Sequence, residues 1–304
     1  MRMKIRKLTA IEPVNFLPEG RERLKDYCGK VIFYDDPPRD AEEIIERIGD
    51  SDGILVSYTN RIGEEILGRC PQLKYIGMCC SLYGESSSNV DIRYAREHGI
   101  IVKGIRDYGD EGVGEYVTAS LIGRLHGTDG HPPFLGRESE VSGVRVGILG
   151  MGASARAVAR ALSAFGAGIS YYSRTRKPEL ESTCGYRYME LYDLLSNCDV
   201  VCSCLSKNVT LLHRKEMELF GDHKILFNTA LSPCFDLDGM EAWLAGENTW
   251  YFCDTLMALG DERLLAYSNV RCQKKSSGMT MQAAERLNEK VLANIREYLD
   301  EVSS

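Results

Sequence analysis

Residues 143–177 constrain the fold of this chain more than any other stretch. The apolar run at 144–149 predicts a short buried strand, and a glycine-rich turn at 150–155 follows it directly. Apolar residues then recur at helical spacing, and a second apolar run at 169–172 predicts another strand. Strand, turn, helix and strand in this order form one βαβ unit, which belongs to a parallel sheet.

The turn inside this unit carries the residue types that a dinucleotide pyrophosphate requires. Gly150 permits the tight bend out of the strand, and Gly152 lets a pyrophosphate approach the backbone because it has no side chain. The free N–H groups and the dipole of the helix start favour an anion. We therefore predict that a dinucleotide binds at Gly150, Met151, Gly152, Ser154 and Ala155. The alternative is a tight strand–helix turn without a ligand.

The residues after the second strand select between the two dinucleotides. An NAD site usually has Asp or Glu there, which binds the ribose 2′-hydroxyl. This chain has Ser173, Arg174, Thr175 and Arg176 instead. Two guanidiniums and two hydroxyls can bind a 2′-phosphate, no carboxylate is present to repel it, and arginine matches phosphate geometry. The turn therefore predicts NADP(H) as the cofactor; the alternative is a solvated basic turn.

Composition limits the compartment and the partners. No apolar run approaches the roughly 20 residues of a membrane helix, and the basic N-terminus lacks the apolar core of a signal peptide. The net charge of −7 argues against general nucleic-acid binding. The eleven cysteines include Cys202 and Cys204, whose spacing puts both thiols on one strand face rather than in a zinc site. We expect a cytoplasmic protein with reduced thiols, no metal, no membrane or nucleic-acid partner, and a small-molecule substrate.

The rest of the chain alternates strands and helices. Before residue 108, the predicted strands are 5–10, 31–34, 53–56, 75–78 and 100–102, and the predicted helices are 19–27, 41–48, 63–69 and 90–98. After the nucleotide unit, the predicted strands are 200–205, 225–229, 250–253 and 269–272, and the predicted helices are 189–195, 215–220 and 240–244. This alternation predicts α/β domains with parallel sheets and helices on both faces.

Two further stretches bear on function and on domain organisation. The polar loop at 79–88 follows a predicted strand at its carboxyl end, where open α/β sheets bind ligands. This loop is a candidate substrate wall; the alternative is a surface loop. The final helix carries Ala284, Leu287, Val291 and Ile295 on one face. That face must be buried, and we expect it to pack on the first domain.

These motifs resemble those of the D-isomer-specific 2-hydroxyacid dehydrogenase family over nearly the whole chain. The similar segments are 73–77, 89–91, 99–102, 111–117, 147–152, 199–201, 228–230 and 269–270, together with Thr210, Asp254 and Gly278. The resemblance implies two Rossmann-like or flavodoxin-like α/β domains with parallel sheets, the second inserted in the first. Residues 1–108 and 281–304 would form the substrate domain, and residues 109–280 the NADP-binding Rossmann domain. Enzymes of this family are usually dimers, so the resemblance also implies a homodimer.

The resemblance implies positions for the cofactor and for the chemistry as well. The rest of the cofactor cleft would be lined by Leu205, Ser206, Thr210, Thr229, Ala230, Leu231 and Asp254. In the family, an arginine holds the substrate carboxylate, a histidine donates the proton, and a glutamate keeps that histidine charged. The aligned positions here are Leu231 for the arginine, Lys275 for the histidine and the vicinity of Leu259 for the glutamate. None of the three is retained.

These replacements change the expected chemistry. Leucine cannot make the bidentate contact of an arginine with a carboxylate, a loss of roughly 1.5–3 kcal/mol in binding, so Leu231 suits a neutral or bulkier carbonyl or imine. Lys275 is the first candidate for the proton donor, because a lysine in a partly desolvated site can have its pKa lowered towards neutrality. The alternative is an exposed lysine without a role. Tyr83, Tyr108 and Arg106, in loops expected to face the crevice, are further candidates.

We predict an NADP(H)-dependent oxidoreductase of the D-2-hydroxyacid dehydrogenase type, which transfers hydride to a carbonyl-type carbon that need not belong to a 2-keto acid. Two alternatives stay open. A catalytically inactive NADP(H)-binding or regulatory protein is favoured if Leu231 and Leu259 seal the crevice, whereas convergence of Lys275 and Tyr83 favours an enzyme. A standard 2-keto acid reductase would use Arg106 or Lys275 as a substitute cation.

Replacing Arg174 with alanine tests the cofactor prediction. We expect the variant to lose affinity for NADPH far more than for NADH, because only NADPH carries the 2′-phosphate that the guanidinium would bind. Dissociation constants for both cofactors, measured by quenching of the protein's fluorescence, check this expectation. Equal losses for the two cofactors would contradict an NADP site at this turn.

Overall fold

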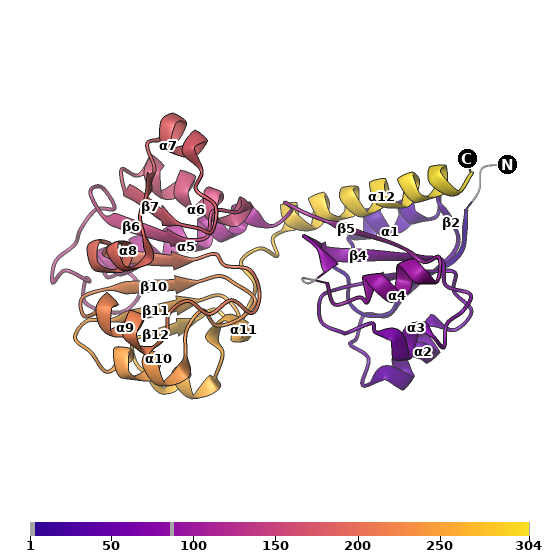
Figure 1. The fold of residues 1–304 in the computed structure, drawn as a ribbon, viewed down its shortest axis with the longest axis horizontal. Helices are drawn as coiled ribbons and strands as arrows, with labels where there is room; N and C mark the ends of the chain where they lie inside the picture. Colours follow the sequence, from indigo (N-terminus) through magenta and orange to yellow (C-terminus); the bar gives the residue numbers. More distant parts are fainter. Residues whose placement is uncertain (1–3, 86–87, 304) are drawn as a thin grey trace. The chain divides into compact units, whose positions relative to one another are not determined.

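The structure is a computed structural model and describes residues 4–85 and 88–303. The chain forms two compact units (Figure 1): Met1–Tyr108 with Met281–Ser304 make up unit 1, and Gly109–Thr280 make up unit 2. Each unit is built on one sheet whose strands pair in parallel. The predicted α/β architecture with two parallel sheets is confirmed. Parallel pairing places the carboxyl ends of all strands of a sheet at one edge.

Unit 1 contains a five-stranded sheet with the order β2-β1-β3-β4-β5. The strands are β1 (Ile5–Ala10), β2 (Cys28–Phe33), β3 (Gly53–Val56), β4 (Tyr75–Ser81) and β5 (Ile101–Ile105). One face packs under α1 (Pro18–Leu24) and α12 (Met281–Ser303), and the other under α2 (Ala41–Ile48), α3 (Glu64–Leu67) and α4 (Ile92–Glu97). Because both faces are covered, the central strands are apolar along their length, and β3 is buried at every position.

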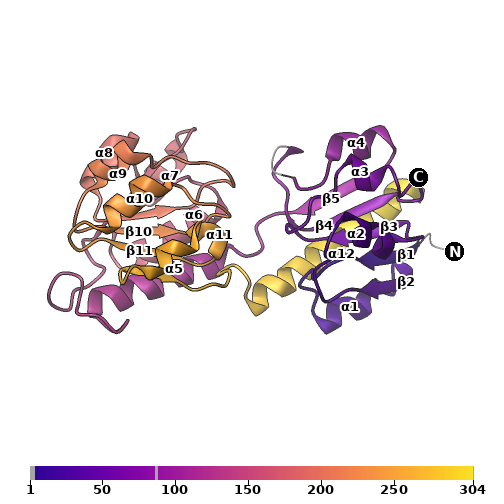
Figure 2. The ribbon, with the colours of Figure 1, turned by 90° about the horizontal axis from the view of Figure 1, so that it is seen from below.

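The C-terminal helix α12 closes one face of this sheet. Figure 2 shows it lying across the strands beside α1. Its residues Leu287, Val291 and Ile295 are buried in the core cluster of unit 1. The ring of Tyr298 lies 4.6 Å from the ring of Tyr75 in β4. The expectation that the final helix packs on the first part of the chain is therefore confirmed.

Unit 2 contains a seven-stranded sheet with the order β12-β11-β10-β9-β6-β7-β8. The strands are β6 (Arg145–Leu149), β7 (Gly168–Tyr172), β8 (Arg187–Tyr188), β9 (Val200–Ser203), β10 (Ile225–Asn228), β11 (Trp250–Cys253) and β12 (Val270–Cys272). The strand order reverses beside β6, which pairs with β7 on one side and with β9 on the other. Open α/β sheets bind ligands outside the carboxyl ends of their strands at such a reversal.

Helices cover both faces of the unit 2 sheet. The helices are α5 (Asp110–His126), α6 (Ala153–Ala164), α7 (Pro178–Cys184), α8 (Leu191–Asn197), α9 (Arg214–Phe220), α10 (Leu237–Leu244) and α11 (Leu256–Leu259), with a 3₁₀ turn at Glu262–Ala266. α5 and α6 pack in one core cluster, and α8 to α11 pack in the other. The buried Arg124 of α5 is paired with Asp129 and lies 4.2 Å from the centre of the Trp250 ring, so its charge is compensated.

Several predicted boundaries differ from the structure. β4 continues through Cys79, Cys80 and Ser81, so the loop expected at 79–88 begins three residues later. Cysteine behaves as a small apolar residue, and both thiols are buried in the core. Ser86 and Ser87 of that loop lie outside the described residues. The helix predicted at 189–195 is present as α8 (Leu191–Asn197), which begins and ends two residues later.

Candidate functional site

The turn between β6 and α6 has the geometry that the sequence predicted. Gly150 has a φ of 92°, and a Cβ there would lie 2.8 Å from the carbonyl oxygen of Cys204, so only glycine fits. A Cβ on Gly152 would meet nothing within 4 Å, and no side chain caps α6 at this residue. Space is therefore left beside the start of α6, where the first N–H groups of a helix have no partner within the helix, as a pyrophosphate site requires.

The other predicted residues of this turn have different surroundings. The side chains of Met151 and Ala155 are buried in the core of unit 2, so these two residues offer a ligand only their backbone. The hydroxyl of Ser154 donates a hydrogen bond to the Asp110 carboxylate at the start of α5. An anion at this turn would therefore meet backbone N–H groups rather than side chains.

The turn after β7 presents two arginines in unlike environments. Arg174 is exposed and forms no ion pair with any residue in 4–85 or 88–303. Arg176 donates from Nε and Nη2 to the carboxylate of Glu181, at 2.7 and 2.6 Å. The hydroxyl of Ser173 donates to the carbonyl oxygen of Thr175 at 2.8 Å. A carboxylate that the linear sequence does not place beside the strand is thus brought to the turn by α7.

The loops after β9 and β10 are joined by hydrogen bonds. Asn228, at the end of β10, is fully buried and donates from Nδ2 to the carbonyl oxygens of Ser232 and Ala258, both at 3.0 Å. Its Oδ1 accepts from the N–H of Ala230, and the backbone N–H of Thr229 donates to the Ser203 carbonyl oxygen. The side chain of Asn228 therefore fixes the predicted segment Thr229–Ala230–Leu231. Sequence reasoning used Asn228 only to align this strand.

The predicted residues of the loop after β9 are less buried than Asn228. Leu205 and Thr210 are partly buried, and Ser206 is exposed. The loop is tied to the next one through the N–H of Asn208, which donates to the Ser232 hydroxyl at 2.8 Å. These residues follow the carboxyl end of β9, one of the two strands that flank β6.

Asp254, directly after β11, is a buried carboxylate with one unpaired oxygen. Its Oδ2 accepts from the N–H and the hydroxyl of Ser277, at 2.9 and 2.8 Å. Its Oδ1 is buried and has no hydrogen-bond partner in the part of the chain that the structure describes. Burial raises the pKa of this carboxyl, and the hydrogen bonds from Ser277 oppose that shift. A buried acceptor without a partner is unusual in a folded protein, which makes Asp254 a candidate functional group.

Three of the four predicted catalytic candidates gather at the carboxyl ends of β4 and β5 in unit 1. The guanidinium of Arg106 donates to the carbonyl oxygens of Leu82 and Tyr83, at 2.7 and 3.3 Å, and lies 5.3 Å from the centre of the Tyr83 ring. Tyr108 is hydrogen-bonded to Ser81, and burial raises the pKa of its hydroxyl. Tyr108 therefore suits a neutral hydrogen-bond donor better than a proton donor, since its phenolate is disfavoured.

Lys275 belongs to unit 2 and follows β12. Its N–H donates to the Asp254 carbonyl oxygen at 2.7 Å, which places the residue beside the buried carboxylate. Its side chain is exposed, so the packing of unit 2 does not desolvate this ammonium group. The segment that carries it follows the last strand at its carboxyl end, where backbone hydrogen bonds to β11 leave long side chains free to extend into solvent.

The two leucines at the positions of the family's arginine and glutamate differ in solvent exposure. Leu259 is fully buried in the core of unit 2, whereas Leu231 is 37% exposed. Leu256 and Met257, on the outer side of α11, are exposed as well. The sealing of a crevice by Leu231 and Leu259, which would favour a binding protein, is therefore not formed within unit 2, because Leu259 completes the core instead.

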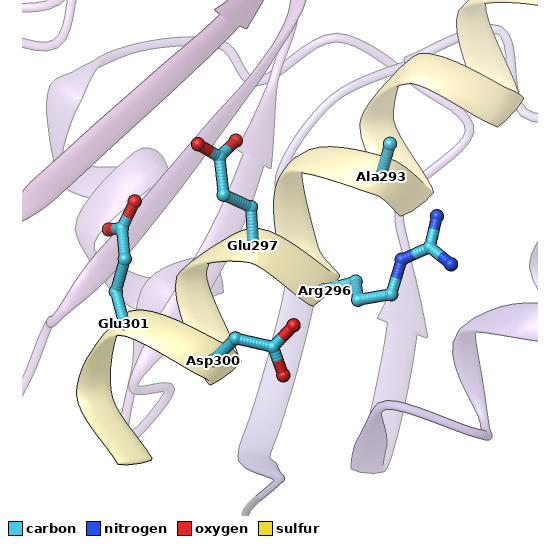
Figure 3. A pocket seen from close by; sticks show the side chains of 5 residues that line it. All are labelled: Ala293, Arg296, Glu297, Asp300 and Glu301. Atoms are coloured by element: carbon cyan, nitrogen blue, oxygen red, sulfur yellow. The ribbon is translucent and has the colours of Figure 1, made fainter. Parts of the chain in front are cut away.

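Figure 3 shows an open hollow on the outer face of α12, which belongs to unit 1. It is lined by Ala293, Arg296, Glu297, Asp300 and Glu301, all of them exposed. Lys103 is paired with Glu297 and Glu301, at 3.2 and 2.7 Å. No buried polar group faces this hollow among the described residues, so it is not a candidate for the functional site.

Comparison with known proteins identifies the class. The family model described as "D-isomer specific 2-hydroxyacid dehydrogenase, catalytic domain" matches residues 9–304. A hydroxypyruvate reductase of Blautia hydrogenotrophica is 27% identical over 89% of this chain and 89% of its own length. A glyoxylate reductase of Thermococcus gammatolerans is 26% identical over 92% of this chain and 89% of its own length. The solved structure of an acyclic imino acid reductase with NADPH and D-Arg covers 97% of both chains, with a TM-score of 0.81 and 21% identity.

The chain belongs to the D-isomer-specific 2-hydroxyacid dehydrogenase family. Its relatives are reductases, and the protein is an NAD(P)-dependent oxidoreductase that acts on CH–OH or C=O groups. Across residues 4–85 and 88–303, no three His, Cys, Asp or Glu side chains are placed to hold a metal ion. No helix in those ranges has the length and apolar character needed to cross a membrane.

Replacing Asp254 with asparagine tests the cost of its buried charge. Burial raises the folded-state pKa of this carboxyl, so the charged form destabilises the fold as the pH rises through that value, and the cost is absent below the ordinary value of 3.8. We expect Asp254→Asn to raise the melting temperature near neutral pH by about 2–4 °C, the shift that roughly 1 kcal/mol causes in a unit of this size.

Circular-dichroism melts of the protein without cofactor, over a series of pH values, measure this effect. The gain is expected to shrink as the pH falls towards the ordinary pKa of a carboxyl, because the wild-type group is then protonated in both states. An equal gain at every pH would show that the charge of Asp254 is not its source.

Proposed function

We propose that this protein is an NADP(H)-dependent reductase that transfers hydride to a carbonyl or imine carbon without the usual arginine–carboxylate contact. The observation that supports the cofactor is the uncapped start of α6 at Gly152. The exposed guanidinium of Arg174, which forms no ion pair among the described residues, follows after β7. The observation that supports the substrate class is the exposed apolar side chain of Leu231 at the position of the family's arginine.

Each unit takes a distinct role in this proposal. Gly109–Thr280 is the NADP-binding domain, and Met1–Tyr108 with Met281–Ser304 is the substrate domain. Residues 150–155 would bind the pyrophosphate through backbone N–H groups, and Ser173, Arg174 and Thr175 would bind the 2′-phosphate. When bound, the nicotinamide ring supplies the hydride. The remainder of the cofactor cleft would be lined by Leu205, Ser206, Thr210, Thr229–Leu231 and Asp254. The buried Oδ1 of Asp254, which has no partner among the described residues, would accept a hydrogen bond if cofactor binding opened a path to it.

Lys275 is the residue that we assign to proton transfer. Its ammonium group is exposed and carries no ion pair within the described part of the chain, so it is available to a substrate. An arginine cannot release its proton at neutral pH, so Arg106 can bind a substrate anion but cannot serve as the acid. Tyr108 is the weaker candidate because burial raises its pKa. Tyr83, which is 58% exposed, remains a candidate for substrate contact.

A standard 2-keto acid reductase is the second candidate function. The hydroxypyruvate and glyoxylate reductases among its relatives favour it. In that case Arg106 or Lys275 would bind the substrate carboxylate in place of the missing arginine. A binding protein without turnover is disfavoured, because Leu259 is buried in the core rather than sealing a crevice with Leu231. We also propose that the protein is cytoplasmic, since all eleven cysteines are free thiols. That it forms a homodimer is proposed from the family alone.

A panel of carbonyl substrates tests the substrate class. We expect neutral ketones, aldehydes or cyclic imines to have kcat/KM at least about tenfold above glyoxylate and hydroxypyruvate, because Leu231 offers no charge to a carboxylate. Oxidation of NADPH, followed by absorbance, measures each rate. Turnover confined to keto acids would replace this proposal with the standard reductase. Tight NADPH binding without any turnover would favour the binding protein.

Replacing Lys275 with alanine tests the proton donor. We expect turnover to fall by about 10²–10⁴-fold, the usual contribution of a positioned acid, while the dissociation constant for NADPH stays unchanged. The matched control is Lys274→Asn, which removes the neighbouring charge and tolerates the backbone φ of 58° at that position. Normal turnover in Lys275→Ala, or an equal loss in the control, would remove Lys275 from the mechanism.

A further inference from the structure

The two arginines of the turn after β7 differ in what holds them. The side chain of Arg174 extends into solvent without a partner among residues 4–85 and 88–303. Arg176 is held in a bidentate ion pair by Glu181 of α7, with N···O distances of 2.7 and 2.6 Å. A planar guanidinium paired in this way has used two of its five donors and has its charge balanced locally.

The ion pair is anchored in the core of unit 2 by Tyr171. This residue is fully buried in β7, and its hydroxyl donates to Glu181 Oε1 at 2.9 Å. The same hydroxyl accepts from the N–H of Lys177 at 2.7 Å, which fixes the end of the turn. The carboxylate of Glu181 is therefore held in place by a residue of the core, whereas in an ordinary surface ion pair both side chains are mobile.

Arg176 is also restrained on its other side. Its guanidinium carbon lies 5.6 Å from the centre of the Tyr188 ring, within the range of a cation–π contact. The side chain of Glu181 is only 19% exposed. The hydrogen bonds from Arg176 hold the pKa of the Glu181 carboxyl below its usual range, so this group is ionised at neutral pH. A phosphate that approaches Arg176 therefore meets a fixed negative charge beside it.

We propose that Glu181 is a specificity-determining residue of the cofactor site, which limits the preference for NADPH over NADH. By holding Arg176 in an ion pair, it leaves Arg174 as the cation that meets a 2′-phosphate. The carboxylate also repels that phosphate and so lowers the affinity for NADPH. NADH has an uncharged hydroxyl at the same place, so its affinity is not lowered by this repulsion. This inference rests on the proposed assignment of residues 173–176 to the 2′-phosphate.

Replacing Glu181 with glutamine tests the effect of its negative charge separately from that of its hydrogen bonds. The amide oxygen of glutamine can still accept from Tyr171 and from Arg176, so the turn keeps its support while the negative charge is lost. The matched control is Glu179→Gln, which makes the same charge change in α7. The Glu179 side chain is exposed and has no ion pair in the described ranges. Thermal melts verify that both variants fold, and Glu181→Ala provides a second route to the same loss of charge.

Calorimetric titrations with adenosine 2′,5′-bisphosphate and 5′-AMP measure the effect on the adenosine end alone, and titrations with NADPH and NADH extend it to the whole cofactor. In Glu181→Gln we expect the affinity for the 2′-phosphorylated ligands to rise roughly three- to tenfold, with a smaller gain at high salt, because a like charge beside the phosphate is removed. The affinities for 5′-AMP and NADH are expected to stay within about twofold in the same variant, since these ligands carry no 2′-phosphate. Glu179→Gln is expected to change none of them.

Other results would overturn the inference. Unchanged or weaker binding of adenosine 2′,5′-bisphosphate to Glu181→Gln would show that Glu181 supports the phosphate site or has no part in it. An equal gain in Glu179→Gln would show that only net charge matters. If the wild type does not prefer NADPH and Arg174→Ala leaves both affinities alone, the cofactor assignment itself fails. If that preference and that loss are found but Glu181→Gln has no effect, only the role of Glu181 fails.

Discussion

Parallel strand pairing in unit 2 is the constraint on which the candidate site depends. Because β6, β7, β9, β10 and β11 all run in the same direction, the turns that follow them emerge at one edge of the sheet. The reversal of strand order at β6 separates the turn after β7 from the loops after β9 and β10. The pyrophosphate turn, the basic turn and Asp254 therefore occupy the same edge although about a hundred residues separate the first from the last.

Burial on both faces made most of the fold readable from the sequence. The strands β1, β3 and β11 and the helix α2 have the bounds that their apolar runs predicted, because continuous apolar runs and amphipathic stripes are strong signals. The helix α7 was missed. It buries none of its residues and starts with Pro178, so it carries no apolar stripe to read. The two-residue strand β8 is too short to show a pattern.

The site was readable only where it is local in sequence. The glycine turn at 150–155 and the basic turn at 173–176 are contiguous motifs with a known geometric reason. Contacts made by the fold were not readable. Glu181 lies only five residues after Arg176, but their pairing depends on α7, which the sequence did not predict. Ser277 contacts Asp254 from 23 residues away, and no motif links the two positions. The exposure of Lys275 was not readable for a related reason, since exposure depends on how the chain packs around a residue.

The return of the chain to unit 1 has a consequence for the order in which the protein is made. Strands β1 to β5 leave the ribosome first, but α12 supplies Leu287, Val291 and Ile295 to the core beneath them. The intervening residues Gly109–Thr280 form a compact unit of their own and can fold before that helix exists. The part of this face that α12 covers therefore stays exposed through most of translation, when it is open to chaperones or to aggregation.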